Sequence, residues 1–249
     1  VAAVRRAEAE APNWFGELPS SACAVEEVPA ALAEGSPPAY YFTGALDGSR
    51  AGTYFINTLR PGERFRHQAE AVAFHEAVPG HHFQLTIAQE LASRHVVHAV
   101  LGDTATAEGW GLYAERLADE MGLYSGDVAR LGMVGTDAWR AARLVVDTGL
   151  HALGWSRQRA IDWMAANAPL SQLEIETEVD RYVAVPGQAL SYMVGRLELE
   201  SLRARAAAAL GERFDLRAFH DLVLRCGPVP LPALGAALDR WIAAEASAR

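Results

Sequence analysis

The sequence predicts a mainly α-helical protein with a small antiparallel β element ahead of the helices. From about Pro61 onward, apolar residues recur with helical periodicity in segments bounded by Gly, Pro and Asp. Runs of aromatic and β-branched residues occur almost only at 39–43 and 52–58, on either side of the turn-rich segment LDGSRA. Residues 1–38 are rich in proline, so we expect an irregular segment there with one short helix.

The length and composition fit a single domain. A chain of 249 residues with 51% hydrophobic content can bury a proper core. We divide it into an irregular segment (1–38), a β element (39–60) and a helical core (61–249). The predicted helices cover residues 66–78, 82–100, 104–121, 127–153, 157–167, 171–184, 187–210, 216–226 and 231–247.

Charge and composition exclude several classes of function. The net charge of -9 argues against a nucleic-acid partner. All 22 basic residues are arginine, which excludes lysine Schiff-base chemistry and the phosphate-binding P-loop. Cys23 and Cys226 lie far apart and outside any CxxC pattern, so neither a disulfide framework nor a thiolate zinc site is indicated.

The sequence also predicts no membrane partner, because no run approaches the roughly 18 apolar residues of a membrane span. The N-terminus carries no apolar signal-peptide core, which favours a cytoplasmic location. Residue 1 is Val rather than Met, so a processing site, an alternative start and the edge of a longer protein all stay open.

Histidines are concentrated in one part of the chain. Six of the eight lie within 32 residues: His67, His75, His81, His82, His95 and His98. The centre of this group reads HEAVPGHH over residues 75–82, which resembles the HExxH arrangement of zinc peptidases. There, two histidines on one helix face bind one Zn²⁺, and the Glu polarises the coordinated water.

The spacing differs from HExxH, because Pro79 occupies the position of the second histidine. In an uninterrupted helix, His82 would lie about 10 Å along the axis from His75, too far for two bonds of about 2 Å to one ion. Pro79 interrupts a helix and Gly80 permits a bulge or a reversal, so the extra residues can loop out and return His81 or His82 to His75. The alternative is a helix-capping loop with exposed histidines.

A third ligand is expected from a neighbouring helix, and a carboxylate would complete a His₂Glu site. Glu108 lies in the small, apolar stretch TATAEGWGLYAE, where an unpaired carboxylate is costly. Gly109 and Gly111 allow another backbone to approach closely. Glu115 shares the face of Glu108 but is followed by charged residues, so we expect Glu108 to be the ligand and Glu115 to form surface pairs or to support a ligand.

Two further segments carry polar residues within apolar surroundings. Arg143, Asp147 and His151 are spaced four residues apart on one helix face, which predicts an Arg143–Asp147 ion pair that orients His151. The alternative is an amphipathic face with solvated charges. Tyr182 and Tyr192 flank the Pro186-Gly187 break between two helices, where a phenol can donate to an oxyanion or pack between the helices.

The remaining histidines are expected to have no role at the site. His220 is remote in sequence from the histidine group and has no ligand-like neighbour, so we interpret it as structural. His95 and His98 are expected at the surface or in a loop.

Several long motifs in order resemble the DUF885 family, a bacterial family with features of zinc peptidases. The likeness extends upstream to AYYFTGALDGSRAGTYFINT and covers the chain from about residue 28. The motifs that carry it are HEAVPGHHFQ, EGWGLYAERLADEMGLY, RAARLVVDTGLHALGW, EVDRYVAVPGQALSYMVG and FDLRAFHDLVL.

The resemblance implies a mostly helical, gluzincin-like metallopeptidase domain, distantly similar to oligopeptidases and dipeptidyl carboxypeptidases. By motif, His75, His81 and Glu108 would bind Zn²⁺, and Glu76 would be the general base. His81 is preferred to His82 because Gly80-His81 is similar to the Gly-His ending of HExGH motifs.

The resemblance also implies roles for residues around the metal. The segment around Tyr192 is similar to a tyrosine-rich segment that stabilises the oxyanion in those oligopeptidases, and we name His151 as the other candidate for that task. Supporting or substrate-binding roles fall to His82, Arg143, Asp147 and Tyr182.

The expected function is therefore zinc-dependent hydrolysis of peptide bonds in short peptides, with Glu76 as the general base. Residues 52–57 are expected to form an edge strand that pairs with the substrate backbone. Family members are about twice as long, so an N-terminal half or a partner subunit is expected to complete the cleft. The alternatives are a half-enzyme that binds metal or peptide without turnover, and a zinc hydrolase of other amides or esters.

Overall fold

The computed structural model describes residues 1–34, 36–63, 65–92 and 102–247. Three strands precede most of the helices: β1 (Ala24–Glu27), β2 (Ala39–Phe42) and β3 (Thr53–Ile56). The helices are α1 (Ala2–Trp14), α2 (Ala69–Glu76), α3 (His81–Ala92), α5 (Thr104–Glu120), α6 (Asp127–Ala152), α7 (Arg157–Asn167), α8 (Gln172–Ala184), α9 (Ser191–Leu210), α10 (Leu216–Cys226) and α11 (Leu231–Ser247). The mainly α class is confirmed.

The sheet is mixed, with β3 between β1 and β2. β2 and β3 form the predicted antiparallel pair, and β1 adds a parallel neighbour in which Ala24 lies opposite Thr53. The expectation that residues 52–57 form an edge strand is therefore wrong, because β1 and β2 are the edges. β1 reads AVEE and is half exposed, so its own sequence carries no alternating pattern, and its pairing with β3 makes it a strand.

Within residues 1–38, α1 is the expected helix but is longer than predicted, and β1 is a strand where an irregular segment was expected. α1 has 13 residues, and its buried face consists of small residues at helical spacing: Ala3, Val4, Ala7 and Ala11. Alanine is a strong helix former, but it contributes little to a hydrophobic pattern, so the periodicity is inconspicuous in the sequence.

The helical part follows the prediction closely. Residues 66–78 split into a 3₁₀ turn and α2, and residues 187–210 into a 3₁₀ turn (Gln188–Leu190) and α9. The predicted helix 82–100 begins at His81, and its continuation over 93–100, which includes His95 and His98, lies outside the described residues. In the part of the chain that the structure describes, no helix has the length and apolar content to cross a membrane.

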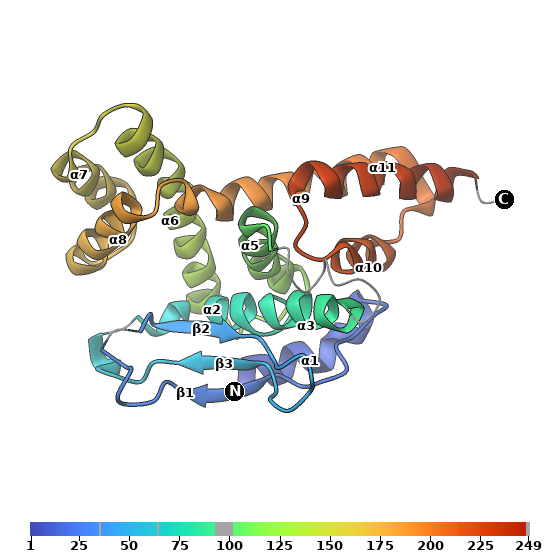
Figure 1. Cartoon of the computed structure of the whole chain (residues 1–249), viewed down its shortest axis with the longest axis horizontal. Coiled ribbons are helices and arrows are strands. Elements are labelled where there is room, and N and C mark those ends of the chain that lie inside the picture. Colours follow the sequence, from blue (N-terminus) through green and yellow to red (C-terminus); the bar gives the residue numbers. More distant parts are fainter. Residues whose placement is uncertain (35, 64, 93–101, 248–249) are drawn as a thin grey trace.

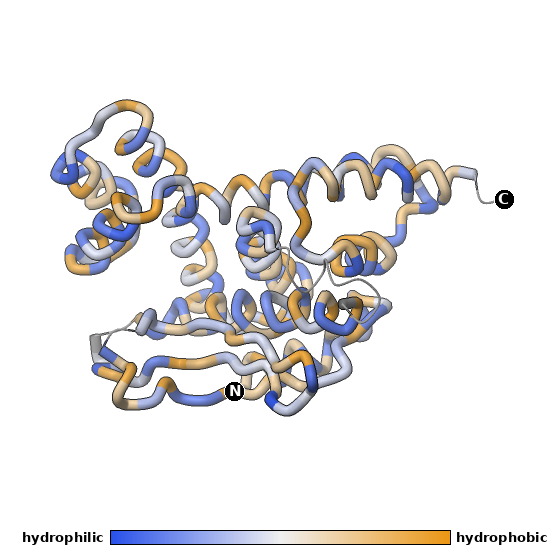
Figure 2. Tube along the Cα trace, in the orientation of Figure 1, coloured by the Kyte–Doolittle hydropathy of each residue, from blue (hydrophilic) through white to orange (hydrophobic). Residues whose placement is uncertain are grey.

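Two hydrophobic clusters organise the helices. The larger cluster joins the sheet with α1, α2, α3, α5, α9, α10 and α11, and the smaller one joins the second half of α6 with α7 and α8. Figure 1 shows the strands and α1 below α2 and α3, with α6, α7 and α8 at the upper left. Apolar and polar residues alternate around most helices (Figure 2), as expected for elements that bury one face.

The position of α5 depends on its cap and on two glycines. The Asp103 carboxylate accepts the N–H of Thr106 at 2.9 Å and begins the helix. α5 then packs against α9 at Gly109, where a Cβ atom would lie 2.5 Å from the Cα of Gly195. The expected close approach of another backbone at Gly109 is confirmed. This contact with α9 sets the position of the neighbouring residues of α5.

Candidate metal centre

The helical path is interrupted between α2 and α3 in the segment Ala77–Gly80. α2 ends at Glu76 and α3 begins at His81. A Cβ atom at Gly80 would lie 1.8 Å from the carbonyl oxygen of His75, so this close approach requires glycine. With this interruption, the rings of His75 and His81 lie at a centroid distance of 4.7 Å and an angle of 87°. The predicted return of a histidine to His75 is confirmed.

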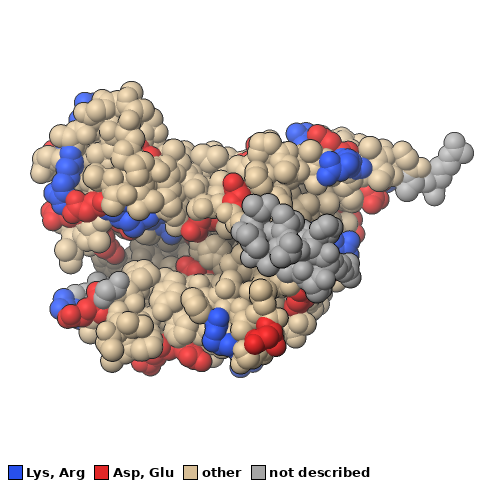
Figure 3. All heavy atoms as spheres, in the orientation of Figure 1, with Lys and Arg blue, Asp and Glu red and all other residues tan. Residues whose placement is uncertain are grey.

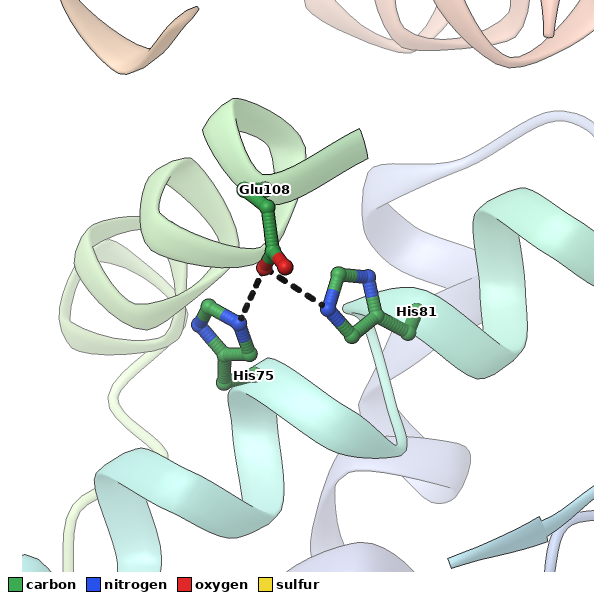
Figure 4. A group of neighbouring side chains, drawn as sticks. All are labelled: His75, His81 and Glu108. Carbon is green, nitrogen blue, oxygen red and sulfur yellow. Dashed lines mark hydrogen bonds and ion pairs between the residues drawn. The ribbon is translucent and has the colours of Figure 1, made fainter. Parts of the chain in front are cut away.

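α5 places the Glu108 carboxylate against both imidazoles. Its Oε2 lies 3.4 Å from Nε2 of His75 and 3.3 Å from Nε2 of His81 (Figure 4). One ligand atom from each residue lies within 4.8 Å of the other two. The three side chains come from the helices α2, α3 and α5 and point toward a common position.

A second carboxylate lies behind His75. Glu115, one of the buried residues of α5, accepts from Nδ1–H of His75 at 2.8 Å and from the Thr136 hydroxyl at 2.6 Å. This contact orients the imidazole so that its Nε2 faces Glu108, an arrangement typical of histidines that bind metals. The expectation of surface pairs for Glu115 is wrong, and its supporting role agrees with the geometry. At Gly111, a Cβ atom would lie 2.6 Å from the His75 ring, so this glycine makes room for the imidazole rather than for a backbone.

The charges of this group are strongly coupled. Burial disfavours a charged His75, but the contacts with Glu108 and Glu115 outweigh burial and raise the pKa of His75 to about 10. Burial likewise opposes ionisation of Glu108, yet His75 and His81 hold the pKa of that carboxyl well below its usual value. His75 is therefore the protonated, cationic imidazolium at neutral pH in the metal-free protein. A metal ion would have to displace the proton on its Nε2, the nitrogen that faces Glu108.

Glu76 follows His75 directly and lies beside the edge of the sheet. Its Oε2 accepts the backbone N–H of Tyr41, in strand β2, at 2.9 Å. The side chain is half buried. The edge strand nearest to the candidate site is therefore β2.

Tyr192 lies on the other side of His75. Its ring centroid is 6.2 Å from that of His75, and its hydroxyl accepts from Nε2 of Gln188 at 3.3 Å. The guanidinium carbons of Arg140 and Arg143 lie 4.7 Å and 4.5 Å from the Tyr192 ring. Of the two tyrosines, the structure brings Tyr192 to the site.

His82 does not join His75 and His81. Its Nδ1 accepts from the Tyr41 hydroxyl at 3.1 Å, and its Nε2–H donates to the Ser21 carbonyl at 3.0 Å. Because adjacent residues of a helix differ by about 100° in direction, α3 can present only one of the two histidines to Glu108.

The expected group on α6 is not assembled as predicted. Arg143 donates to Glu178 at 2.9 Å, and Asp147 accepts the Gly187 N–H at 3.1 Å, so the Arg143–Asp147 ion pair is wrong. The reason is that α8 and the loop after it pack on this face of α6 and supply closer partners for both side chains.

His151 and Tyr182 lie outside the candidate site. His151 is exposed at the end of α6, about 22 Å along the helix axis from Thr136, and donates to the Tyr182 carbonyl at 2.9 Å. Tyr182 is buried between α6 and α8, and its hydroxyl accepts from Trp139 and Arg143. The structure therefore gives His151 no access to an oxyanion at His75, and Tyr182 packs between helices.

Comparisons with known proteins identify the family. The profile described as "Bacterial protein of unknown function (DUF885)" matches residues 1–238, and the chain belongs to this family. The chain is similar to a solved protein of Colwellia psychrerythraea described as a putative lipoprotein, at 36% identity and a TM-score of 0.93, over 97% of this chain and 42% of that one. No curated protein matches the chain.

A second solved structure shows the same fold. This protein of Shewanella oneidensis, described as a putative lipoprotein of unknown function, has 24% identity and a TM-score of 0.76 over 94% of this chain and 45% of its own. The chain thus spans less than half the length of these two proteins.

Proposed function

We propose that the chain carries the metal-binding domain of a zinc-dependent, gluzincin-like peptidase, with His75, His81 and Glu108 as ligands. The observation that carries this proposal is the convergence of two Nε2 atoms and one carboxylate oxygen from three helices. A His₂Glu donor set leaves coordination positions open, as catalytic zinc sites require. The buried Glu115 behind His75 supports the same conclusion, since it fixes the ring that would bind the ion.

Zinc in such a site supplies Lewis acidity and lowers the pKa of a coordinated water to near neutrality. Glu76 is the proposed general base: its carboxylate takes a proton from the attacking water and passes it to the leaving amine. The Tyr41 N–H holds this carboxylate at the edge strand β2. The Tyr192 hydroxyl is the proposed donor to the oxyanion, because its ring lies against His75.

The proposed substrate is a short peptide. β2 is an edge strand next to Glu76, and an edge strand can pair with an extended peptide backbone. Figure 3 shows the molecule hollowed between the layer of the sheet and the helices α6 to α8, which leaves an approach for a ligand.

A second candidate is a chain that binds metal or peptide without turnover. It is favoured by the length comparison, because more than half of each similar solved protein has no counterpart here. In this case an N-terminal half or a partner subunit would be needed to complete the cleft.

The test is the Glu76→Gln variant, compared with Glu26→Gln, which changes an exposed carboxylate on β1. Hydrolysis of a mixed peptide library is followed by mass spectrometry, and zinc content by elemental analysis. We expect Glu76→Gln to retain zinc and to lose about 10²–10⁴-fold in turnover, and Glu26→Gln to resemble the parent.

The outcomes separate the candidates. Chelation should abolish hydrolysis, and added Zn²⁺ should restore it. A parent protein that binds zinc but cleaves no peptide supports the second candidate, and cleavage restricted to other amides or esters supports the broader hydrolase reading. Full activity of Glu76→Gln would overturn the proposed mechanism.

A further inference from the structure

Two arginines on α6 lie together beside Tyr192. Arg140 and Arg143 are three residues apart and so share a helix face. Their guanidinium carbons lie 3.9 Å and 4.2 Å from the ring of Trp139, and both also lie over the Tyr192 ring. The aromatic rings hold two cationic groups at one position next to the candidate metal centre.

Several hydrogen-bond donors of this pair are buried without an acceptor. Nε and Nη1 of Arg140 and Nη1 of Arg143 have no hydrogen-bond partner among the described residues. Arg143 is only 2% exposed. A buried N–H of a charged group that lacks an acceptor is costly, so each such group calls for an explanation. Arg140 and Arg143 differ from the other arginines of this kind, Arg116 and Arg196, in that they lie together beside Tyr192. The geometry therefore offers a place for an acceptor from outside the chain.

The local charge is unbalanced in the same direction. Arg143 and Arg181 both pair with a single carboxylate, that of Glu178, at 2.9 Å. Within the described part of the chain, Arg140 has no ion pair. Burial, together with the neighbouring Arg143, lowers the pKa of Arg140. A cationic excess of this kind in a chain with a net charge of -9 calls for an anion.

The distance from the pair to His75 matches a short piece of peptide. The Tyr192 ring lies 6.2 Å from the His75 ring and 4.7 Å from the Arg140 guanidinium carbon, so the two outer groups are separated by no more than the sum of these distances. An extended residue spans about 3.5 Å. An anion at the arginines would therefore lie within about three residues of a peptide carbonyl held beside His75.

We propose that Arg140 and Arg143 bind the free C-terminal carboxylate of the substrate, which would make the domain a carboxy-terminal exopeptidase. The proposal rests on the peptidase function proposed above. A guanidinium fork matches a carboxylate in geometry and charge better than any other protein group does. Arg140 is only partly buried, which leaves an approach to the pair.

The test measures binding with the metal removed, so that it does not depend on turnover. N-acetylglycylphenylalanine and its C-terminal amide are titrated into the chain in the presence of a chelator and followed by calorimetry. We expect the free acid to bind about 10- to 100-fold more tightly than the amide. Arg140→Gln should abolish this difference, since it removes the guanidinium of Arg140 with its two unpartnered donors and breaks no ion pair of the described residues.

The matched control is Arg159→Gln. Arg159 also stacks on a tryptophan, with its guanidinium carbon 4.4 Å from the Trp155 ring, but it is exposed on α7. This variant should retain the preference for the free acid. Arg140→Lys keeps the charge without the fork and should show an intermediate preference, which separates recognition from a loss of folding in Arg140→Gln.

The outcomes are decisive for the carboxylate site. Equal affinity for acid and amide, no binding of either, or an undiminished preference in Arg140→Gln would overturn the proposal. A preference that Arg140→Gln removes would support it even if the zinc-loaded chain cleaves no peptide. In that case the peptidase function fails while the carboxylate site stands.

Discussion

Two buried histidines of this protein differ in the charge of their partners. His75 contacts the carboxylates of Glu108 and Glu115, whereas His220 accepts from the Tyr113 hydroxyl at 2.8 Å and donates to the Trp14 carbonyl at 3.0 Å. The pKa of His75 is raised to about 10, while burial among neutral partners lowers the pKa of His220 to about 4. Burial alone therefore does not mark a candidate ligand, and the chemistry of the partners does.

The two imidazoles also differ in what surrounds them. His220 packs against aromatic rings, with centroids 5.0 Å from Phe15 and 6.1 Å from Trp110. Its two hydrogen bonds leave no ring nitrogen free, which agrees with the structural role expected from the sequence. His75 instead turns Nε2 toward Glu108 and His81, where an ion can replace the shared proton.

The largest expected effect separates the two histidines by metal content. His75→Ala and His81→Ala should reduce bound zinc from about one ion per chain to near zero, because a catalytic site has only three protein ligands. His220→Ala and His82→Ala should retain the ion. Elemental analysis after dialysis against micromolar zinc measures the zinc content of each variant. Zinc retention by His75→Ala would contradict the role of His75 as a ligand.

The pH dependence of stability should differ in sign between the two sites. The pKa of His220 in the folded protein lies below its unfolded value of about 6.5. Its contribution to the free energy of unfolding is therefore complete above pH 6.5 and is lost as the pH falls toward 4. The full loss is about 3 kcal/mol. Urea unfolding of the parent and of His220→Gln between pH 7 and 4.5 should show a shallower acid limb in the variant. If the stability of the parent and of His220→Gln fell equally with pH, the lowered pKa of His220 would be contradicted.

His75 should show the opposite limb in metal-free protein. The pKa of His75 in the folded protein is raised. Its contribution to the free energy of unfolding is therefore complete below pH 6.5 and is lost as the pH rises toward 10. His75→Gln should therefore be less sensitive than the parent to alkaline pH in the presence of a chelator, as measured by urea unfolding at pH 7 and 9. An alkaline limb that is unchanged by the substitution would argue against the pairing with two carboxylates.

A smaller effect is expected behind the ligand. Glu115→Gln should lower zinc affinity about 10- to 100-fold without abolishing binding, because the amide orients His75 less effectively than the carboxylate. Glu120→Gln on the same helix is the control, since Glu120 is exposed and pairs with Arg203. Competition with a chromophoric chelator gives both affinities. Equal values for the two variants would assign Glu115 a purely structural role.

Much of the helical architecture and the centre of the candidate site could be predicted from the sequence. Hydrophobic periodicity located most of the helices, and the HEAVPGHH segment indicated a break after Val78 that returns a histidine to His75. The prediction was weakest where the local pattern was faint: the alanine-lined α1 was expected only as a short helix, and the four-residue β1 was missed. It also failed on α6, where Arg143 and Asp147 each found a closer partner outside their own helix.

The sequence by itself determined which residue types are available: a His-Glu pair, a Pro-Gly break and an acid in a helix of small residues. Tertiary structure alone decided that His81 meets Glu108 while His82 contacts Tyr41 and Ser21. It also decided that Arg140 lies beside Tyr192 with donors unpartnered by the described residues. The reason is that a helix fixes the relative directions of its side chains, whereas the partner each one meets depends on elements distant in sequence.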